Sequence, residues 1–125
     1  MILLDTSVLI DLFRKKEKEN SFFYSLLDYD EEFAISAITH YEIGIGNKKS
    51  KSNYWNHVYE NLEFLDFNKS ASDLAIDIYL NLKINNKIID IADILIASVA
   101  MSNDISLATL NNKHFERIDG LKLIK

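Results

Sequence analysis

The sequence predicts an α/β domain with a mostly parallel central sheet flanked by helices. Two observations lead to this prediction: short strand-like runs alternate with longer helical patterns, and the chain has no proline and only three glycines. The alternation is typical of parallel sheets, while the scarcity of turn residues argues against a β-sandwich. With 125 residues, 48% of them hydrophobic and 26% charged, we place a single domain at residues 1–125.

The strands are predicted from short apolar runs and the helices from apolar side chains at helical spacing. The predicted strands are Ile2–Leu4, Phe33–Ile35, Phe64–Phe67, Ser106–Thr109 and Leu121–Ile124. The predicted helices are Val8–Arg14, Ser21–Leu27, Ser36–Ile45, Tyr54–Leu62, Ser70–Ile84 and Ile91–Met101. In the third helix, Ser36 is expected to be the N-cap, and Gly44 and Gly46 are expected to end it.

Charge and composition narrow the possible function classes. The chain has no cysteine, which excludes a disulfide framework and a thiolate metal site. A net charge of −5 argues against a protein that coats nucleic acid without specificity, because such domains are basic. No secretory signal and no membrane-spanning apolar run are visible, so we expect a cytoplasmic protein without a membrane partner.

Asp5 is the first candidate site residue. The segment Met-Ile-Leu-Leu-Asp-Thr-Ser ends a strand-like run in a carboxylate just where a helical pattern begins. In open α/β sheets, ligands bind at the carboxyl ends of the strands, which favours a functional role for this acid. Asp, Thr and Ser are also common helix N-caps, so capping is the structural alternative.

Glu42 is the second candidate. On a helix it shares a face with Ile38, Tyr41 and Ile45, which places a carboxylate at the edge of a predicted core-facing stripe. An ionised acid in that position is costly unless it is paired or binds a cation. A buried ion pair, or a helix rotation that exposes Glu42, would also explain it.

Asp93 is the third candidate, near the start of the last long helical pattern. Asp90 is a suitable N-cap, and both acids could serve the helix terminus and its dipole. However, Asp93 shares a face with Ala97 and Ala100, whose small side chains let the helix approach the sheet closely. We interpret Asp90 as the cap and Asp93 as the acid directed into the crevice.

Three acids in one cleft would repel one another unless a cation lies between them. Asp5, Glu42 and Asp93 offer hard oxygen ligands, and neither His nor Cys stands at zinc-like spacing, so the set favours Mg²⁺ or Mn²⁺. The chemistry typical of such a centre is phosphodiester hydrolysis by metal-activated water.

Four segments of the chain resemble motifs of a known family. They are LLDTSVLIDLF, AISAITHYEIGIG, IADILIASVA and LATLNNKHFERIDGLKLI. Together they occur in the order and spacing of PIN-domain proteins, and more narrowly they resemble VapC-type toxins of bacterial and archaeal toxin–antitoxin pairs. The resemblance covers essentially the whole chain.

The resemblance implies a role for each matching position. Asp5, Glu42 and Asp93 would be the first, second and third metal-binding acids, while Ser7 and Thr109 would orient or hydrogen-bond groups within the cleft. It also implies hydrolysis of RNA, with transfer or ribosomal RNA as reasonable substrates. The implied partners are a cognate antitoxin, which binds beside the cleft with a basic side chain among the acids, and a second copy of the chain in a homodimer.

One family position differs in this chain. A fourth acid often follows the position of Thr109, but here the stretch reads Thr-Leu-Asn-Asn-Lys-His-Phe, with His114 where an acid is common. We therefore expect one metal position and leave a second open. Asn111 could supply a carbonyl or hold a metal-bound water, and His114 could contact phosphate, but both are also ordinary loop residues.

Three other functions compete with the ribonuclease. A structure-specific DNA nuclease of the same fold would carry a fuller acid set and additional DNA-binding elements. A catalytically inactive PIN-like binding module would fit the missing fourth acid. A phospho-accepting receiver module would need its acids at successive strand ends, whereas Glu42 and Asp93 are predicted on helices.

Basic runs and an aromatic stripe are weaker signals. The runs would contact an RNA backbone or be solvated helix ends, and they comprise Arg14, Lys15, Lys16 and Lys18, then Lys48, Lys49 and Lys51. Tyr54, Trp55 and Tyr59 form a stripe more typical of a core or a protein interface than of base stacking. His40 and His57 are expected at the surface.

Overall fold

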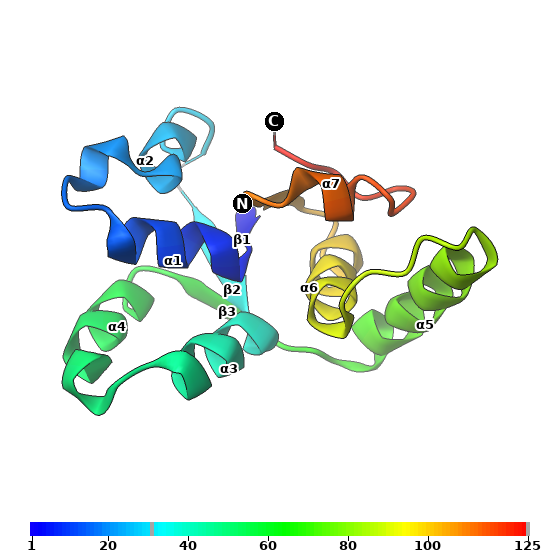
Figure 1. Ribbon diagram of the computed structural model, residues 1–125, viewed down its shortest axis with the longest axis horizontal. Helices are drawn as coiled ribbons and strands as arrows, with labels where there is room; N and C mark the ends of the chain where they lie inside the picture. Colours follow the sequence, from blue (N-terminus) through cyan, green and yellow to red (C-terminus); the bar gives the residue numbers. More distant parts are fainter. Residues whose placement is uncertain (31, 125) are drawn as a thin grey trace.

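The computed structural model describes residues 1–30 and 32–124 and confirms the parallel α/β architecture (Figure 1). Within these residues, four strands form one sheet in the order β3-β2-β1-β4, and each pairing between them is parallel. They are β1 (Ile2–Leu4), β2 (Phe33–Ser36), β3 (Glu63–Leu65) and β4 (Ser106–Ala108). Because β1 lies between β2 and β4, its carboxyl end is at the middle of one edge of the sheet.

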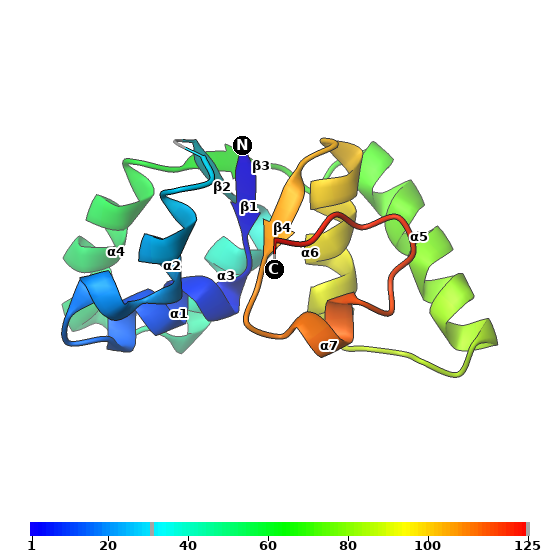
Figure 2. The same cartoon turned by 90° about the horizontal axis from the view of Figure 1, so that it is seen from above.

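The helices cover the two faces of this sheet. Figure 2 shows α1 to α4 on one side and α5 to α7 on the other. Their bounds are α1 (Thr6–Arg14), α2 (Phe22–Leu26), α3 (Ala37–Gly46), α4 (Ser52–Tyr59), α5 (Lys69–Ile84), α6 (Ile91–Ser102) and α7 (Asn112–Phe115). Two short 3-10 turns, η1 (Lys18–Asn20) and η2 (Lys49–Lys51), precede α2 and α4.

Alternation along the short strands divides the core into two parts. Leu3 and its neighbour Ala34 face α5 and α6, where they pack with Ile94, Leu107 and Phe115. The adjacent strand residues face α1 to α4, and with helix residues they form a second cluster of Ile2, Leu4, Val8, Leu9, Leu26, Phe33, Ile35, Ile43, Trp55 and Ala108. Successive side chains of a strand point to opposite faces, so the continuous apolar run is buried on both sides.

Two predicted strands differ from the structure by more than one residue at an end. The segment Leu121–Ile124 is not a regular strand, because its pairing to β4 is a single bridge between Leu107 and Leu123. The strand predicted at Phe64–Phe67 instead begins at Glu63 and ends at Leu65. It has no partner beyond Leu65, since the residue opposite is Ser36, where β2 gives way to α3.

The glycines of α3 do not end the helix where the sequence predicted. Gly44 and Gly46 both lie within α3, and neither has a positive φ. The C-cap is Asn47, which takes an extended conformation, whereas Ser36 is the N-cap as predicted, its hydroxyl accepting a bond from the Thr39 amide at 3.1 Å. Across the described residues, no helix is both long enough and apolar enough to span a bilayer.

Candidate active site

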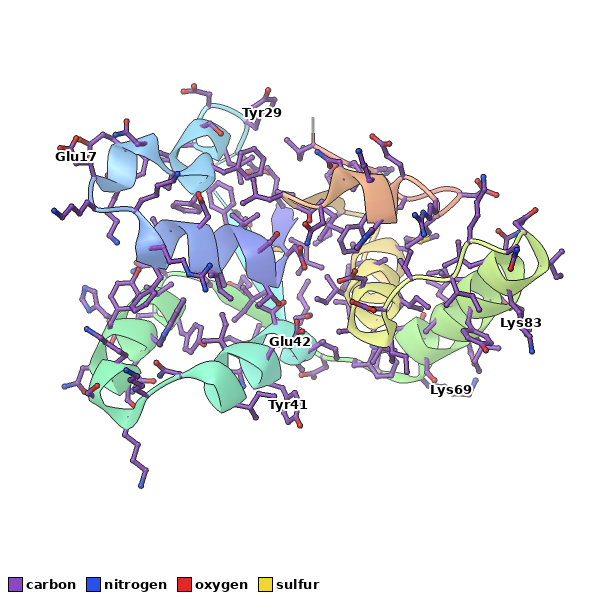
Figure 3. The ribbon with its side chains drawn as sticks, viewed as in Figure 1. Glu17, Tyr29, Tyr41, Glu42, Lys69 and Lys83 are labelled. Atoms are coloured by element: carbon purple, nitrogen blue, oxygen red, sulfur yellow. The ribbon has the colours of Figure 1, made fainter. Side chains whose placement is uncertain are left out.

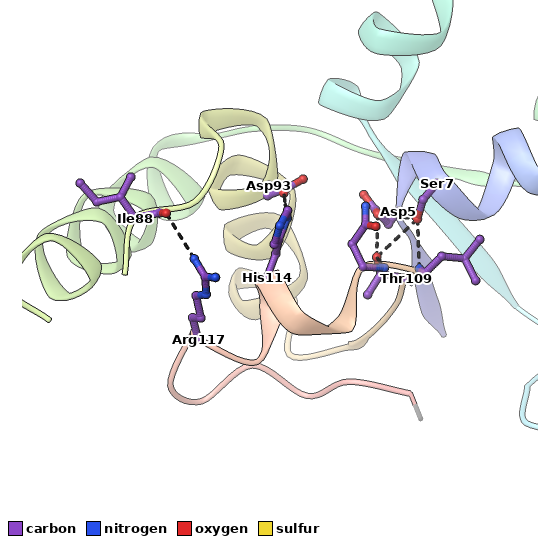
Figure 4. Close-up of polar contacts among 9 residues, drawn as sticks. Asp5, Ser7, Ile88, Asp93, Thr109, His114 and Arg117 are labelled. Atoms are coloured by element: carbon purple, nitrogen blue, oxygen red, sulfur yellow. Dashed lines mark hydrogen bonds and ion pairs between the residues drawn. The ribbon is translucent and has the colours of Figure 1, made fainter. Parts of the chain in front are cut away.

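The predicted site lies where β1 and β4 end. The amide of Asp5, directly after β1, donates to the carbonyl of Ala108 at 2.9 Å, so Asp5 and Thr109 are held side by side. Figure 4 shows Asp5, Ser7 and Thr109 as one cluster, with Asp93 and His114 as a second cluster beside it. Parallel strands that end at one edge thus bring together residues from both ends of the chain.

The Asp5 carboxylate does not cap α1. Asp5 occupies the N-cap position but makes no side-chain capping bond, and it is only 2% exposed. Its Oδ2 atom instead accepts hydrogen bonds from the hydroxyls of Ser7 and Thr109, both at 2.7 Å. The capping alternative is therefore wrong, and Asp5 is a buried acid oriented by two hydroxyl donors.

Those hydroxyls are themselves held by backbone amides. The Leu110 amide donates to Ser7 Oγ at 3.1 Å, and the Asn111 amide donates to Thr109 Oγ1 at 3.0 Å. The contribution of Asn111 to the cluster is thus its main chain, since no side-chain hydrogen bond of Asn111 is present within the described residues. The loop after β4 accordingly fixes the donors that orient Asp5.

Glu42 is half-buried and lies on the side of α3 that faces α1. Its Oε1 atom accepts a hydrogen bond from Thr6 Oγ1 at 2.7 Å, and Thr6 Oγ1 is also 3.0 Å from Thr39 Oγ1. Within residues 1–30 and 32–124, no basic side chain forms an ion pair with Glu42. This excludes the buried ion pair with any described residue.

The predicted apolar face of α3 is only partly correct. Ile38 is half-buried, but Tyr41 is 64% and Ile45 is 70% exposed. Figure 3 shows the Tyr41 side chain pointing away from the rest of the molecule. The fully buried positions of this helix are instead Thr39 and Ile43. The buried face of α3 is therefore displaced by about one residue from the predicted face. Apolar residues lie on nearly every side of this short helix, so their spacing does not determine which side is buried.

Asp93 lies in the first turn of α6 and is also half-buried. Its Oδ2 atom is 3.3 Å from Nδ1 of His114, which α7 places opposite it. Ala97 and Ala100 on the same face are fully buried, as predicted. Asp90 occupies the N-cap position but makes no side-chain capping bond, so only its position agrees with the prediction.

Electrostatics link the two clusters. Burial raises the pKa of the Asp93 carboxyl above its ordinary value near 3.8, and the nearby charge of Asp5 raises that pKa further. The hydrogen bond and charge of His114 lower it, while Asp90 contributes a smaller rise. The Asp5 carboxylate is therefore near enough to Asp93 to disfavour the ionised form of Asp93.

The donor set fits a hard divalent cation in chemistry, although its side chains are not arranged as a closed ligand shell. No three described His, Asp or Glu side chains form a group that could hold a metal ion in their present positions. Among the described residues, the hydrogen bonds to Asp5 and Asp93 go to Oδ2 of each carboxylate, so neither Oδ1 is used by a protein donor.

Most residues behind the weaker sequence signals have structural roles. Lys18 donates to the carbonyls of Leu12, Phe13 and Lys15 at 2.8 to 3.0 Å, so it closes the end of α1 and is not free for a phosphate. Trp55 is buried in the core, in agreement with the prediction. His40 is exposed as predicted, although its ring also packs edge-on against neighbouring aromatic side chains.

Comparison with known proteins agrees with this architecture. A family model described as the PIN domain matches residues 2–121. "Ribonuclease VapC1" of Methanocaldococcus jannaschii is 36% identical over 98% of this chain and 85% of its own length. "Ribonuclease VapC2" of Rickettsia felis is 30% identical over 97% of this chain and 94% of its own length.

Solved structures give the same result. The crystal structure of VapBC2 from Rickettsia felis, bound to a DNA fragment from its promoter, superposes with a TM-score of 0.85 at 29% identity. The match covers 99% of this chain and 98% of that one, so every element that carries a candidate residue falls within it. The chain described here belongs to the PIN domain family.

Proposed function

We propose that this protein is a metal-dependent endoribonuclease, the toxin of a toxin–antitoxin pair, and that it acts in the cytoplasm. The observation that carries the proposal is that Asp5, at the end of β1, and Asp93, in the first turn of α6, lie in neighbouring clusters and are close enough for the charge of Asp5 to raise the pKa of Asp93. The relatives named ribonucleases support RNA as the substrate. We propose transfer and ribosomal RNA as the candidate classes.

Asp5, Glu42 and Asp93 would hold Mg²⁺ or Mn²⁺. When bound, such an ion supplies a nucleophilic water at neutral pH and stabilises negative charge on the phosphoryl oxygens. The mutual repulsion of Asp5 and Asp93 favours a cation between them, because both carboxylates are attracted to a divalent ion and this attraction outweighs their repulsion. His114 contacts Asp93 where an acid would be needed for a second ion, so we propose a single metal position.

The surrounding residues orient these acids and the RNA. Ser7 and Thr109 hold the Asp5 carboxylate, and His114 holds that of Asp93. Beside them, residues Leu110 to His114 line an open hollow of about 310 Å³, large enough for part of a nucleotide. Lys113 on its wall offers the positive charge that a phosphate backbone attracts.

An antitoxin is the proposed protein partner. Beside Glu42, a hollow of about 140 Å³ lies between α1, α3 and α4, and its walls include Phe13, Ile43 and Trp55. An apolar side chain of the partner would fill this hollow, and a neighbouring basic side chain would reach Glu42, which lacks a cationic partner among the described residues. Solved relatives that are toxin–antitoxin complexes support this assignment.

A homodimer is the proposed oligomeric state. The outer face of α5 exposes Ile76, Leu80 and Ile84, which are spaced four residues apart and form one apolar stripe. On α3, Tyr41 and Ile45 are likewise exposed. A second copy that covers these side chains would remove them from water.

The first prediction concerns Asp5→Asn. With structured RNA and Mg²⁺ or Mn²⁺, we expect cleavage to fall at least about a hundredfold, because an amide is a poor ligand for a hard cation. The exposed acid Asp104 lies away from the site, so Asp104→Asn should retain full activity. Equal cleavage by the Asp5→Asn and wild-type proteins would contradict the mechanism.

The same assay separates the alternative functions. Cleavage of a matched DNA without cleavage of RNA would favour the DNA nuclease. If calorimetry detected no binding of millimolar Mg²⁺ or Mn²⁺, the inactive binding module would be favoured.

The second prediction concerns the stability of the metal-free protein. Because the pKa of Asp93 is raised on folding, the folded state binds more protons than the unfolded state above pH 3.8. The raised pKa therefore makes stability fall as pH rises from that value through the folded-state pKa. Asp93→Asn should abolish this contribution and raise the neutral-pH melting temperature measured in the presence of chelator.

Asp104→Asn is the matched control for this measurement. Lys122 lowers the pKa of Asp104 through a 2.7 Å hydrogen bond, so the stability contribution of Asp104 has the opposite sign and is lost as pH falls. A lower neutral-pH melting temperature for Asp93→Asn than for the wild type would contradict the electrostatic account of the site.

The third prediction concerns the hollow beside Glu42. A Cβ atom built at Gly46 meets nothing within 4 Å, so Gly46→Leu should fold normally and fill the hollow that Gly46 lines. We expect antitoxin affinity, measured by calorimetry, to fall at least about tenfold, while RNA cleavage is retained.

Gly44→Leu is the matched control for the hollow. Gly44 has equally open surroundings and lines a neighbouring hollow between α3 and α4, which shares Ile43, Asn47 and Trp55 with the first but does not include Glu42. If the two leucine variants weakened antitoxin binding equally, or if neither did, the hollow beside Glu42 would not be the docking site.

A further inference from the structure

A hydroxyl network around Glu42 carries an inference beyond the three acids themselves. The chain contains three threonines, Thr6, Thr39 and Thr109, and the hydroxyls of all three contact the candidate site. Thr109 orients Asp5. Thr6 contacts Glu42 directly, and Thr39 contacts Thr6. Neither of these two residues stands out in the sequence as a site residue.

Thr6 makes the sole hydrogen bond to the Glu42 carboxylate among the described residues. Its Oγ1 lies 2.7 Å from Glu42 Oε1, a short distance typical of a hydroxyl that donates to an ionised acceptor. Without this donor, the long glutamate side chain would be free to turn among several rotamers, which costs entropy when it binds a ligand. The Thr6 hydroxyl therefore selects one orientation of Glu42.

The hydroxyl of Thr39 contacts the hydroxyl of Thr6. Thr39 lies one turn before Glu42 on α3, so both residues face Thr6, and its Oγ1 is 3.0 Å from Thr6 Oγ1. Thr6 has a single hydroxyl proton, and a carboxylate can only accept, so that proton goes to Glu42. Thr39, whose side chain is fully buried, keeps its hydroxyl within hydrogen-bond distance of the Thr6 oxygen and so helps to fix the position of Thr6.

The position of Thr6 in the chain couples two of the acids. Thr6 directly follows Asp5 and begins α1, while Ser7, the next residue, donates to Asp5. Successive helical residues point about 100° apart, so neighbouring hydroxyls can serve different carboxylates. The tripeptide Asp5-Thr6-Ser7 thus supplies one acid, the donor to that acid and the donor to an acid 36 residues away.

We propose that Thr6 is a positioning residue that presents the Glu42 carboxylate to the divalent cation, with Thr39 as its buried support. This role rests on the proposed function, because it assigns Thr6 to the same metal site. Hydrogen-bond partners of metal ligands typically change metal affinity by about 10- to 100-fold when they are removed.

The test measures Mn²⁺ binding to the full chain by calorimetry and the melting temperature without metal. Thr6→Val, which removes the hydroxyl but keeps the branched shape, should weaken Mn²⁺ binding about tenfold. Thr6→Ser, which keeps the hydroxyl, should bind Mn²⁺ within about twofold of the wild type. If valine disturbs the fold, as shown by the metal-free melting curve, Thr6→Ala removes the same hydroxyl and the comparison is repeated with it.

A double-mutant comparison distinguishes positioning from a general structural effect. Because Thr6 is proposed to act through Glu42, Thr6→Val should cause no further loss of affinity in a Glu42→Gln background. The same fold-loss in both backgrounds, wild-type affinity of Thr6→Val, or failure of Thr6→Ser to retain binding would each overturn the role of Thr6.

The controls separate this role from the proposed function. Absence of Mn²⁺ binding by the wild type would overturn the metal site and the role of Thr6 together. Tight wild-type binding that Glu42→Gln weakens and Thr6→Val leaves unchanged would overturn the role of Thr6 alone.

Discussion

The burial of the Asp5 carboxylate at the end of the central strand is the constraint on which the site depends. At 2% exposure an ionised acid is unfavourable unless polar groups surround it, and here two hydroxyls donate to the same oxygen at 2.7 Å. One donor follows Asp5 by two residues and the other comes from the end of β4. The parallel pairing of β1 with β4 is thus required both for the core and for the environment of Asp5.

This constraint extends to the remaining acids. The residue after Asp5 begins α1 and contacts Glu42 on α3, while the loop after β4 leads into α7 and brings His114 to Asp93. Phe115, which is fully buried, anchors α7 against α6 and so fixes the position of His114. Acids from both sides of the sheet are therefore held by separate partners around a shared space, an arrangement that favours ligand binding over stability.

Much of the fold was predictable because the strong signals are local. Apolar runs and helical periodicity identified every strand of the sheet, and the order of motifs indicated the PIN domain. The errors occurred where pairing with a neighbouring strand determines the strand bounds. β3 ends at Leu65 because it has no pairing partner beyond that residue, and 121–124 pairs through a single bridge. The four-residue helix α7 is too short for periodicity to reveal.

The site shows the same division between local and long-range information. Asp5, Glu42 and Asp93 could be predicted as site residues because each is a carboxylate within an otherwise apolar stretch of the sequence. Thr6 and Thr39 were missed because a threonine near a helix start is ordinary, and their contact joins residues 33 positions apart. The orientation of α3 was likewise set by these hydroxyls and by Ile43, which a short apolar helix does not disclose in advance.

The most direct test of the central claim is anomalous diffraction from crystals of the protein soaked in Mn²⁺. We predict one manganese ion bound to an oxygen of Asp5, with at least one further ligand from Glu42 or Asp93. The hydroxyls of Ser7 and Thr109 should remain on the other Asp5 oxygen. Manganese that binds elsewhere in the molecule, with Asp5 still enclosed only by hydroxyls, would contradict it.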